Sequence, residues 1–130
     1  MKFVKFAIVA LLMPVIFFSC KKDNDTVLPV EGNWNGLYSF GIDPPSISYK
    51  LNIKHGGTIE ELSTSGNVKG SGTWNFNGNT LTGHYQWKAP LNTVFSIIAT
   101  YDPATRKLTG TWGYDNSATD GGKWESTKTN

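Results

Sequence analysis

Apolar and polar residues alternate along most of the chain after residue 30. In ISYKLNIK, residues 47–54, every second residue is apolar and the residues between are polar. The same alternation occurs in the segments 34–40, 68–76, 81–87, 95–101 and 108–114. Because successive side chains of a β-strand point to opposite faces of a sheet, this period of two predicts strands with one buried face. This part of the sequence has no apolar residues at helical spacing, so we expect little or no helix.

Two further segments fit a strand less well. TIEELS, residues 58–63, alternates poorly, and GKWES, residues 122–126, offers only Trp124 to an inner face. Turn signals separate the segments, and they are DPP at 43–45, HGG at 55–57, TSGN at 64–67, NGN at 77–79 and DPATR at 102–106. The pattern predicts an all-β fold: an antiparallel meander of about eight short strands, closed into a small up-and-down β-barrel, with a β-sandwich as the alternative.

A short phrase with a glycine two residues before a large aromatic residue occurs three times. It reads KGSGTWNF at 69–76, TLTGHYQW at 80–87 and KLTGTWGY at 107–114. The glycine and the aromatic residue share the inner face, and small barrels are often filled by alternating small and large side chains. We therefore interpret the phrase as a packing unit, in which a ring of a neighbouring strand fills the gap at Gly72, Gly83 or Gly110.

The alternative to packing is an aromatic lining around a ligand, since an eight-stranded barrel is just wide enough to hold one small molecule. The lining would then include the aromatic residues Trp34, Trp74, Tyr85, Trp87 and Trp112. A pocket needs a few placed polar groups, and the predicted inner face has almost none beyond tyrosine hydroxyls and indole N–H groups. The pattern favours a filled barrel, and any ligand held inside it would be apolar or amphipathic.

The start of the chain is organised differently. Lys2 and Lys5 precede the apolar run FAIVALLMPVIFF, residues 6–18, an order that is typical of a signal peptide. Ser19 and the single cysteine, Cys20, follow, and the chain then becomes polar in CKKDND. This junction resembles the lipobox of bacterial lipoproteins of the Bacteroidetes type. The resemblance implies diacylglycerol on Cys20 and an anchor in the outer membrane, at the cell surface or on the periplasmic face; the alternative is an ordinary secreted protein with one unpaired thiol.

These features predict a signal peptide at 1–19, a lipidated polar tether at 20–30 and a β-barrel domain at 31–128. The chain has 12 Lys and Arg against 10 Asp and Glu, and loss of Lys2 and Lys5 with the signal peptide leaves 12 − 2 = 10 of each sign. A net charge of zero gives no reason to expect a nucleic-acid partner. With Cys20 carrying lipid, no disulfide or thiolate metal site is expected within the chain.

No group of residues predicts catalysis, a cofactor or a metal site, and we expect no enzymatic activity. His84 lies on the polar face of its segment, and His55 lies in a glycine turn. Glu60 and Glu61 are adjacent, so they point to opposite faces of a strand and cannot form a paired-carboxylate site. The oxygen-rich loop at 114–122 has ligands that calcium accepts, but we favour a solvated hairpin loop.

Three long loops are candidates for contacts with a glycan or an envelope protein, because loops on rigid scaffolds often carry function. They are GIDPPS at 41–46, KAPLN at 88–92 and YDNSATDGG at 114–122. Their candidate contact residues are Asp43, Tyr114, Asp115 and Asp120. Whether these loops act together depends on the strand order, which decides which of them share an end of the barrel.

GNWNG at 32–36 opens the meander and resembles the Gly-x-Trp opening of the calycins, the lipocalin and avidin group. LTGTW at 108–112 is similar to avidin-type strands. The resemblance implies a barrel whose base Trp34 closes against an arginine of a late strand; the only arginine, Arg106, lies in or beside a turn, and the last strand offers Lys123. Inward serine, asparagine and aspartate groups for biotin are not found in the pattern.

Together, these observations predict a lipid-anchored protein of the cell envelope that acts as a non-enzymatic binding or interaction module. The alternative is a lipocalin-like carrier of a small apolar ligand inside the barrel.

Overall fold

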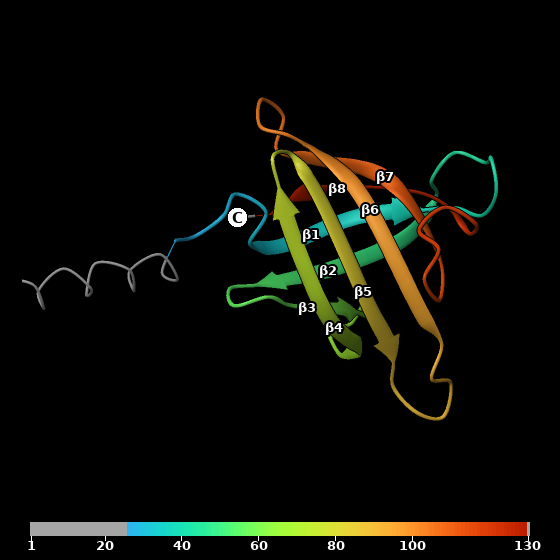
Figure 1. Ribbon diagram of the computed structural model, residues 1–130. Coiled ribbons are helices and arrows are strands. Elements are labelled where there is room, and N and C mark those ends of the chain that lie inside the picture. The colour runs from blue at the N-terminus through green and yellow to red at the C-terminus, as the bar shows by residue number, and fades with distance from the viewer. Residues whose placement is uncertain (1–25, 130) are drawn as a thin grey trace, which may run out of the picture.

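The computed structural model describes residues 26–129, which form a closed antiparallel β-barrel (Figure 1). Its strands are β1 (Gly32–Tyr38), β2 (Ile47–Lys54), β3 (Thr58–Leu62), β4 (Val68–Asn77), β5 (Thr80–Trp87), β6 (Val94–Asp102), β7 (Lys107–Tyr114) and β8 (Gly122–Lys128). Each strand pairs with the next in sequence, and β8 pairs with β1 to close the sheet. The predicted all-β meander and its closure into an up-and-down barrel are therefore confirmed over the sandwich.

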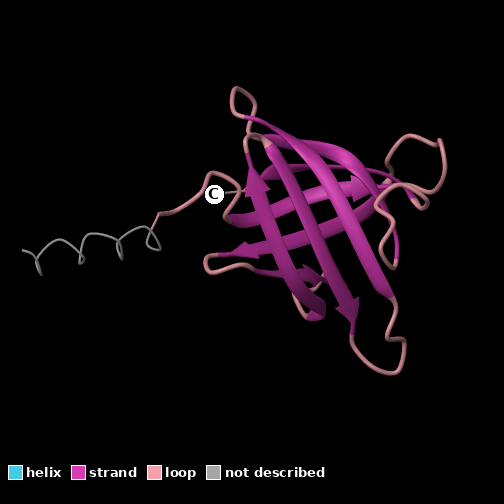
Figure 2. Ribbon diagram, viewed as in Figure 1, coloured by secondary structure: helices cyan, strands magenta, loops and turns pink. Residues whose placement is uncertain are grey.

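The secondary structure between these strands consists of loops and turns (Figure 2). Within the described part of the chain, no helix has the length and hydrophobicity needed to cross a membrane. The predicted signal peptide at 1–19 and the predicted lipidation site Cys20 lie outside the described residues.

The two weak segments of the sequence both form strands. β3 pairs with β2 and β4, and β8 pairs with β7 and β1. Our expectation that residues 58–63 fit a strand poorly was wrong, because ladders on both sides satisfy the backbone of β3 whatever its own propensity. Ile59 and Glu61 of this strand face the interior and are buried.

Because neighbouring strands are antiparallel, successive connections lie at opposite ends of the barrel. One end, which we call the mouth, carries the connections 39–46, 63–67, 88–93 and 115–121. The other end, the base, carries the connections 55–57, 78–79 and 103–106 together with the first and last described residues (Figure 1). The strand order thus places all three long loops at the mouth, away from the end where the chain enters.

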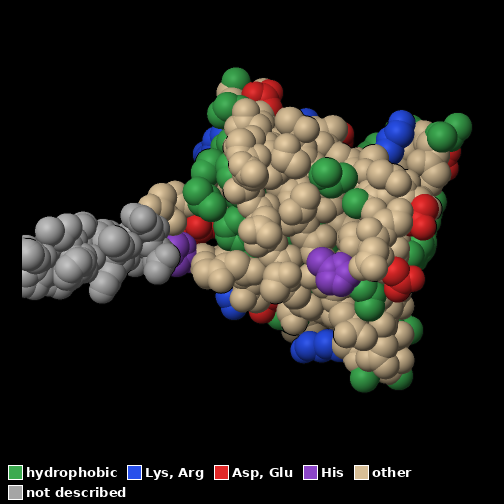
Figure 3. All heavy atoms as spheres, viewed as in Figure 1, with side chains coloured by type: hydrophobic (Ala, Val, Ile, Leu, Met, Phe, Trp, Pro, Cys, Tyr) green, Lys and Arg blue, Asp and Glu red, His purple; other side chains and the backbone are tan. Residues whose placement is uncertain are grey.

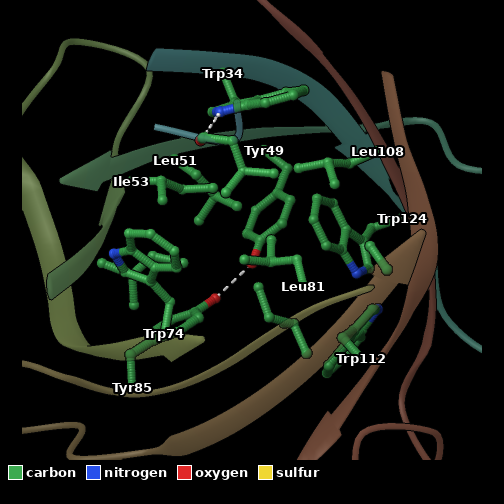
Figure 4. Close-up of a cluster of buried hydrophobic side chains, with 14 of the residues drawn as sticks. Trp34, Tyr49, Leu51, Ile53, Trp74, Leu81, Tyr85, Leu108, Trp112 and Trp124 are labelled. Atoms are coloured by element: carbon green, nitrogen blue, oxygen red, sulfur yellow. Dashed lines mark hydrogen bonds between the residues drawn. The ribbon is translucent and has the colours of Figure 1, made fainter. Parts of the chain in front are cut away.

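The base is closed by the segment that precedes β1. Val30 is fully buried, and its carbonyl accepts a 2.8 Å hydrogen bond from the indole N–H of Trp34 (Figure 4). Lys128 reaches the same end, where its ammonium donates to the carbonyl of Pro29 at 3.1 Å. Packed structure therefore begins at Leu28, within the segment that we expected to be tether, and a backbone carbonyl is the hydrogen-bond partner of Trp34.

The backbones of the first and last strands stay together to the end of the described chain. The amide of Thr129 donates to the carbonyl of Asn33 at 2.9 Å. Beyond the other end of this strand pair, the amide of Ser39 donates to the carbonyl of Lys123 at 2.9 Å, and that of Gly41 donates to Gly121 at 2.8 Å. The first and last strands are therefore joined from the base to the loops of the mouth.

The glycines of the repeated phrase lie opposite aromatic residues of a neighbouring strand. The register pairs Gly72 with Tyr85, Gly83 with Trp74 and Gly110 with Trp124. A Cβ atom at Gly72 or Gly110 would collide with a backbone carbonyl of the neighbouring strand, whereas one at Gly83 would first meet side-chain atoms of Ile97. The phrase therefore lets adjacent strands approach closely while rings fill the interior.

Candidate ligand pocket at the mouth of the barrel

The mouth of the barrel contains a pocket of about 240 Å³. Most of its walls are aromatic, and the strands β1, β2, β3, β5, β6 and β7 all contribute to it. The lining residues are Tyr38, Phe40, Tyr49, Glu61, Tyr85, Trp87, Thr93, Phe95, Trp112 and Tyr114. The interior is thus filled at the base and hollow at the mouth.

Trp112 forms the centre of the aromatic wall. Its indole N–H donates to the carbonyl of Ser39 at 2.9 Å, which fixes the ring against the β1–β2 loop. The rings around it belong to Tyr38, Phe40, Phe95 and Tyr114, with centroid distances of 5.8, 5.5, 5.9 and 5.2 Å. All four pairs meet edge to face, the arrangement that the aromatic quadrupole favours. The wall is therefore a set of mutually packed rings that lines the cavity.

The floor of the pocket holds a buried carboxylate, that of Glu61, which is 5% exposed. One of its oxygens, Oε1, accepts from the Tyr85 hydroxyl at 2.7 Å and from the Trp87 indole N–H at 2.9 Å. The other, Oε2, lies 3.2 Å from the ammonium of Lys69, which also sits 4.7 Å from the centre of the Trp87 ring. A buried charge is tolerated only when it is paired and hydrogen-bonded, and Glu61 meets both conditions.

Two tyrosines extend this network. The hydroxyl oxygens of Tyr49 and Tyr85 lie 2.8 Å apart (Figure 4). The hydroxyl of Tyr85 uses its hydrogen in the bond to Glu61. In the contact between the two tyrosines, Tyr49 must therefore be the donor and Tyr85 the acceptor. Burial, together with the charge of Glu61, raises the pKa of both hydroxyls well above the ordinary value. Both tyrosines therefore stay neutral, and the chain of donors runs from Tyr49 through Tyr85 to Glu61.

Local pairing explains how a carboxylate fits here. Glu61 lies opposite Gly70 of β4, and Gly70 in turn lies opposite Trp87 of β5. A Cβ atom at Gly70 would stand 2.9 Å from the Cα of Trp87. With no side chain between them, the Glu61 carboxylate reaches across β4 to the Trp87 indole. The register also shifts between Glu61 and Leu62, as at a β-bulge, a feature that re-aims side chains.

The structure divides the aromatic candidates of the sequence between the two ends. Tyr85, Trp87 and Trp112 line the pocket. Trp34 and Trp74 do not: Trp34 packs at the base, and the indole of Trp74 donates to the carbonyl of Lys54 at the base turn. The repeated phrase therefore provides packing at Trp74, and pocket walls at Tyr85 and Trp112.

Of the loop candidates, Tyr114 lines the pocket, and Asp43, Asp115 and Asp120 lie in mouth loops outside its lining. Asp120 accepts from the amide of Tyr114 at 2.9 Å, which folds the β7–β8 loop on itself. Within residues 26–129, no three His, Cys, Asp or Glu side chains lie close enough together to hold a metal ion.

The candidate site residues that sequence reasoning missed are Glu61 and Tyr49, which line the pocket, and Lys69, which pairs with Glu61. The signal for Glu61 was present: residues 59 and 61 share one strand face, and Ile59 had to face inward. Glu60 and Glu61 do point to opposite faces, as predicted, with Glu60 paired to Lys54 outside at 3.5 Å. We expected almost no polar groups on the inner face beyond tyrosine hydroxyls and indole N–H groups, and Glu61 is a charged exception, since one of two adjacent glutamates in a strand has to point inward.

Apolar side chains also surround the opening. Phe40 is 51% exposed, Ile42 88%, Leu91 66% and Tyr114 41%. They lie on the β1–β2 loop, the β5–β6 loop and the end of β7, all at the mouth. Apolar side chains stand at the loop tips on the right of Figure 3. The rim continues the apolar character of the walls outward.

No protein-family model matches the chain, and no significant match was found among curated proteins or solved structures. The eight-stranded antiparallel barrel is compatible with the calycin fold that the sequence resembles.

Proposed function

We propose that this protein is a lipid-anchored binding protein of the cell envelope, with a calycin-like barrel that holds a small amphipathic ligand in its mouth and performs no chemistry on it. The observation that carries the proposal is the hydrogen-bonded carboxylate of Glu61 at the floor of an aromatic pocket. Ligand sites are typically apolar hollows with a few placed polar groups that fix orientation. Glu61, Tyr49 and Tyr85 are such groups.

The volume of the pocket limits the size of the ligands that can fit inside it. Its volume of about 240 Å³ lies below the range of roughly 300–1,000 Å³ for drug-sized ligands. A molecule of one or two rings fits this space, whereas most of a long acyl chain would remain outside. A wholly apolar ligand is disfavoured, because it would exclude water from Glu61 and add no hydrogen bond to those from Tyr85 and Trp87.

The position of the mouth supports capture from the aqueous side. The chain enters at the base, and Cys20 precedes Leu28 by 28 − 20 = 8 positions. With diacylglycerol on Cys20, the base faces the outer membrane and the mouth faces away from it. The tract KKDND after the cysteine resembles the lysine-and-acid tract of surface-exported Bacteroidetes lipoproteins, which supports a location on the cell surface, with the periplasmic face of the outer membrane as the alternative.

Thermal unfolding of the mature chain, with Cys20→Ser to keep it soluble, tests the proposal against a panel of small aromatic amines, alcohols and acids. Binding to the folded state raises the unfolding midpoint and alters tryptophan emission, since Trp87 and Trp112 line the pocket. Trp112→Phe should weaken this shift, and Ile98→Ala on the outer face of β6 should leave it unchanged. A panel without any shift, or a shift insensitive to Trp112→Phe, would rule out binding in the mouth.

A second candidate is a surface module that contacts a glycan or an envelope protein through the mouth loops. The observation in its favour is the exposure of Ile42 and Leu91 in two loops of the mouth. Replacing Ile42 and Leu91 together by serine should abolish such a contact and spare binding of a small ligand in the pocket. The reverse pattern, in which only Trp112→Phe matters, argues for the pocket alone.

A further inference from the structure

We infer that the pocket selects a ligand with a protonated, N–H-bearing nitrogen on a small flat apolar body, such as an arylalkylamine, and this inference rests on the proposed function. The observation behind it is an imbalance between hydrogen-bond donors and acceptors at the buried floor. The aromatic walls and the Glu61 carboxylate both favour a positively charged ligand.

The buried donors of the pocket are already used. The Tyr85 hydroxyl and the Trp87 indole donate to Glu61, and the Tyr49 hydroxyl donates to Tyr85. The Trp112 indole donates to the carbonyl of Ser39. A ligand that needs donors from the floor would have to break one of these contacts.

The buried acceptors have room left. The Oε2 atom of Glu61 is held only by the ammonium of Lys69 among the described residues, and a carboxylate oxygen accepts more than one hydrogen bond. The hydroxyl of Tyr49 donates its hydrogen to Tyr85, and its oxygen accepts no hydrogen bond from a described residue. Tyr38, Thr93 and Tyr114 also line the pocket but are less buried, and a hydroxyl can serve in either role. A ligand at the floor is therefore matched when it brings donors.

Lys69 already displays the interactions that such a ligand would make. Its ammonium pairs with Glu61 at 3.2 Å and lies over the Trp87 ring at 4.7 Å. Lys69 is 41% exposed in its side chain and does not line the pocket. Because its side chain is partly exposed, it can turn out to solvent when another cation takes its place. Lys69 thus acts as an internal competitor for the carboxylate.

The aromatic walls favour the same charge. Ring faces carry negative potential and attract ammonium groups, most strongly where water is excluded. A carboxylate ligand would meet both these faces and the charge of Glu61 with no buried donor free to receive it. An uncharged alcohol would keep the apolar contact and one hydrogen bond but lose the charge pairing.

Three compounds of matched shape test the inference: phenethylamine, 2-phenylethanol and 3-phenylpropionate. Their dissociation constants are measured by calorimetry at neutral pH on the mature chain with Cys20→Ser. The amine adds charge pairing and attraction to the ring faces to the hydrogen bond that the alcohol also makes, so we expect the amine to bind at least about tenfold more tightly than the alcohol. The acid should bind most weakly.

Two variants with a matched control locate the effect. Glu61→Gln should abolish the preference for the amine, whereas Glu60→Gln, which removes the same charge from the outer face one residue away, should preserve it. Lys69→Met keeps an apolar stem beside Trp87 and removes the competing ammonium, so it should tighten amine binding. Near-ultraviolet circular dichroism confirms that each variant is folded.

The outcomes separate the two proposals. If the alcohol or the acid binds as tightly as the amine, or if Lys69→Met weakens the amine, the selection of a cation is wrong while binding in the mouth stands. If none of the three compounds binds to the folded wild-type protein, both proposals fail for ligands of this size.

Discussion

The hydroxyl of Tyr85 on β5 donates a 2.7 Å hydrogen bond to the buried carboxylate of Glu61 on β3. Tyr85→Phe removes this donor and also the acceptor of the Tyr49 hydroxyl, leaving two buried polar groups with fewer partners. We expect a loss of about 1–3 kcal/mol in the free energy of unfolding, measured by urea denaturation. Tyr114→Phe is the control, because its hydroxyl makes no hydrogen bond to a described residue; equal losses in the two variants would contradict the network.

Alkaline pH should weaken the fold through Tyr49 and Tyr85. Their pKa values in the folded protein lie well above the ordinary value of 10.0, chiefly because of burial. The folded state therefore retains two protons that the unfolded chain releases, so stability is complete below pH 10 and falls as the pH rises above it. Unfolding curves at stepped pH, followed by tyrosinate absorbance, measure this slope. Tyr49→Phe should make the slope shallower, and ionisation of both tyrosines without unfolding would refute the explanation.

The glycines of the repeated phrase should differ in their tolerance of a methyl group. Gly72→Ala and Gly110→Ala push a Cβ atom into the backbone of the adjacent strand, and we expect each to lower the free energy of unfolding by about 1–3 kcal/mol. At Gly83 the nearest atom is 3.0 Å away on the side chain of Ile97, so Gly83→Ala should cost less. Chemical denaturation of the three variants gives the comparison; the same loss at all three positions would argue against close strand approach as the reason for glycine.

Cys20 should determine where the protein is found in the cell. More than one acyl chain is needed to hold a protein stably on a membrane, and diacylglycerol on Cys20 would supply two. Cys20→Ser should therefore shift the protein from the membrane fraction to the soluble fraction without lowering its unfolding midpoint. Cell fractionation and the mass of the N-terminal peptide measure both parts. Continued membrane association of Cys20→Ser would show that the anchor lies elsewhere.

The strands and the inner face were predictable because period-two alternation follows directly from strand geometry. The same alternation puts Glu61 on the inner face with Ile59, but it does not show that the charge is paired there, because its partners are residues 69, 85 and 87, which lie on other strands. A charged residue breaks the apolar pattern that the prediction uses. The sequence likewise could not show that Trp34 and Trp74 lie at the base and Trp112 at the mouth. Alternation shows which face a residue occupies, but the strand order is needed to show how far along the barrel it lies.

The hydrogen bond between Thr129 and Asn33 brings the two termini of the barrel together at the base. The first and last residues of the barrel thus lie near each other, and a short linker that joins them would allow circular permutation. Reopening the joined chain at the 78–79 turn, also at the base, would leave every mouth loop intact. For the same reason, a fluorescent tag or a fused protein joined beside Leu28 or Thr129 would lie at the base and leave the mouth clear.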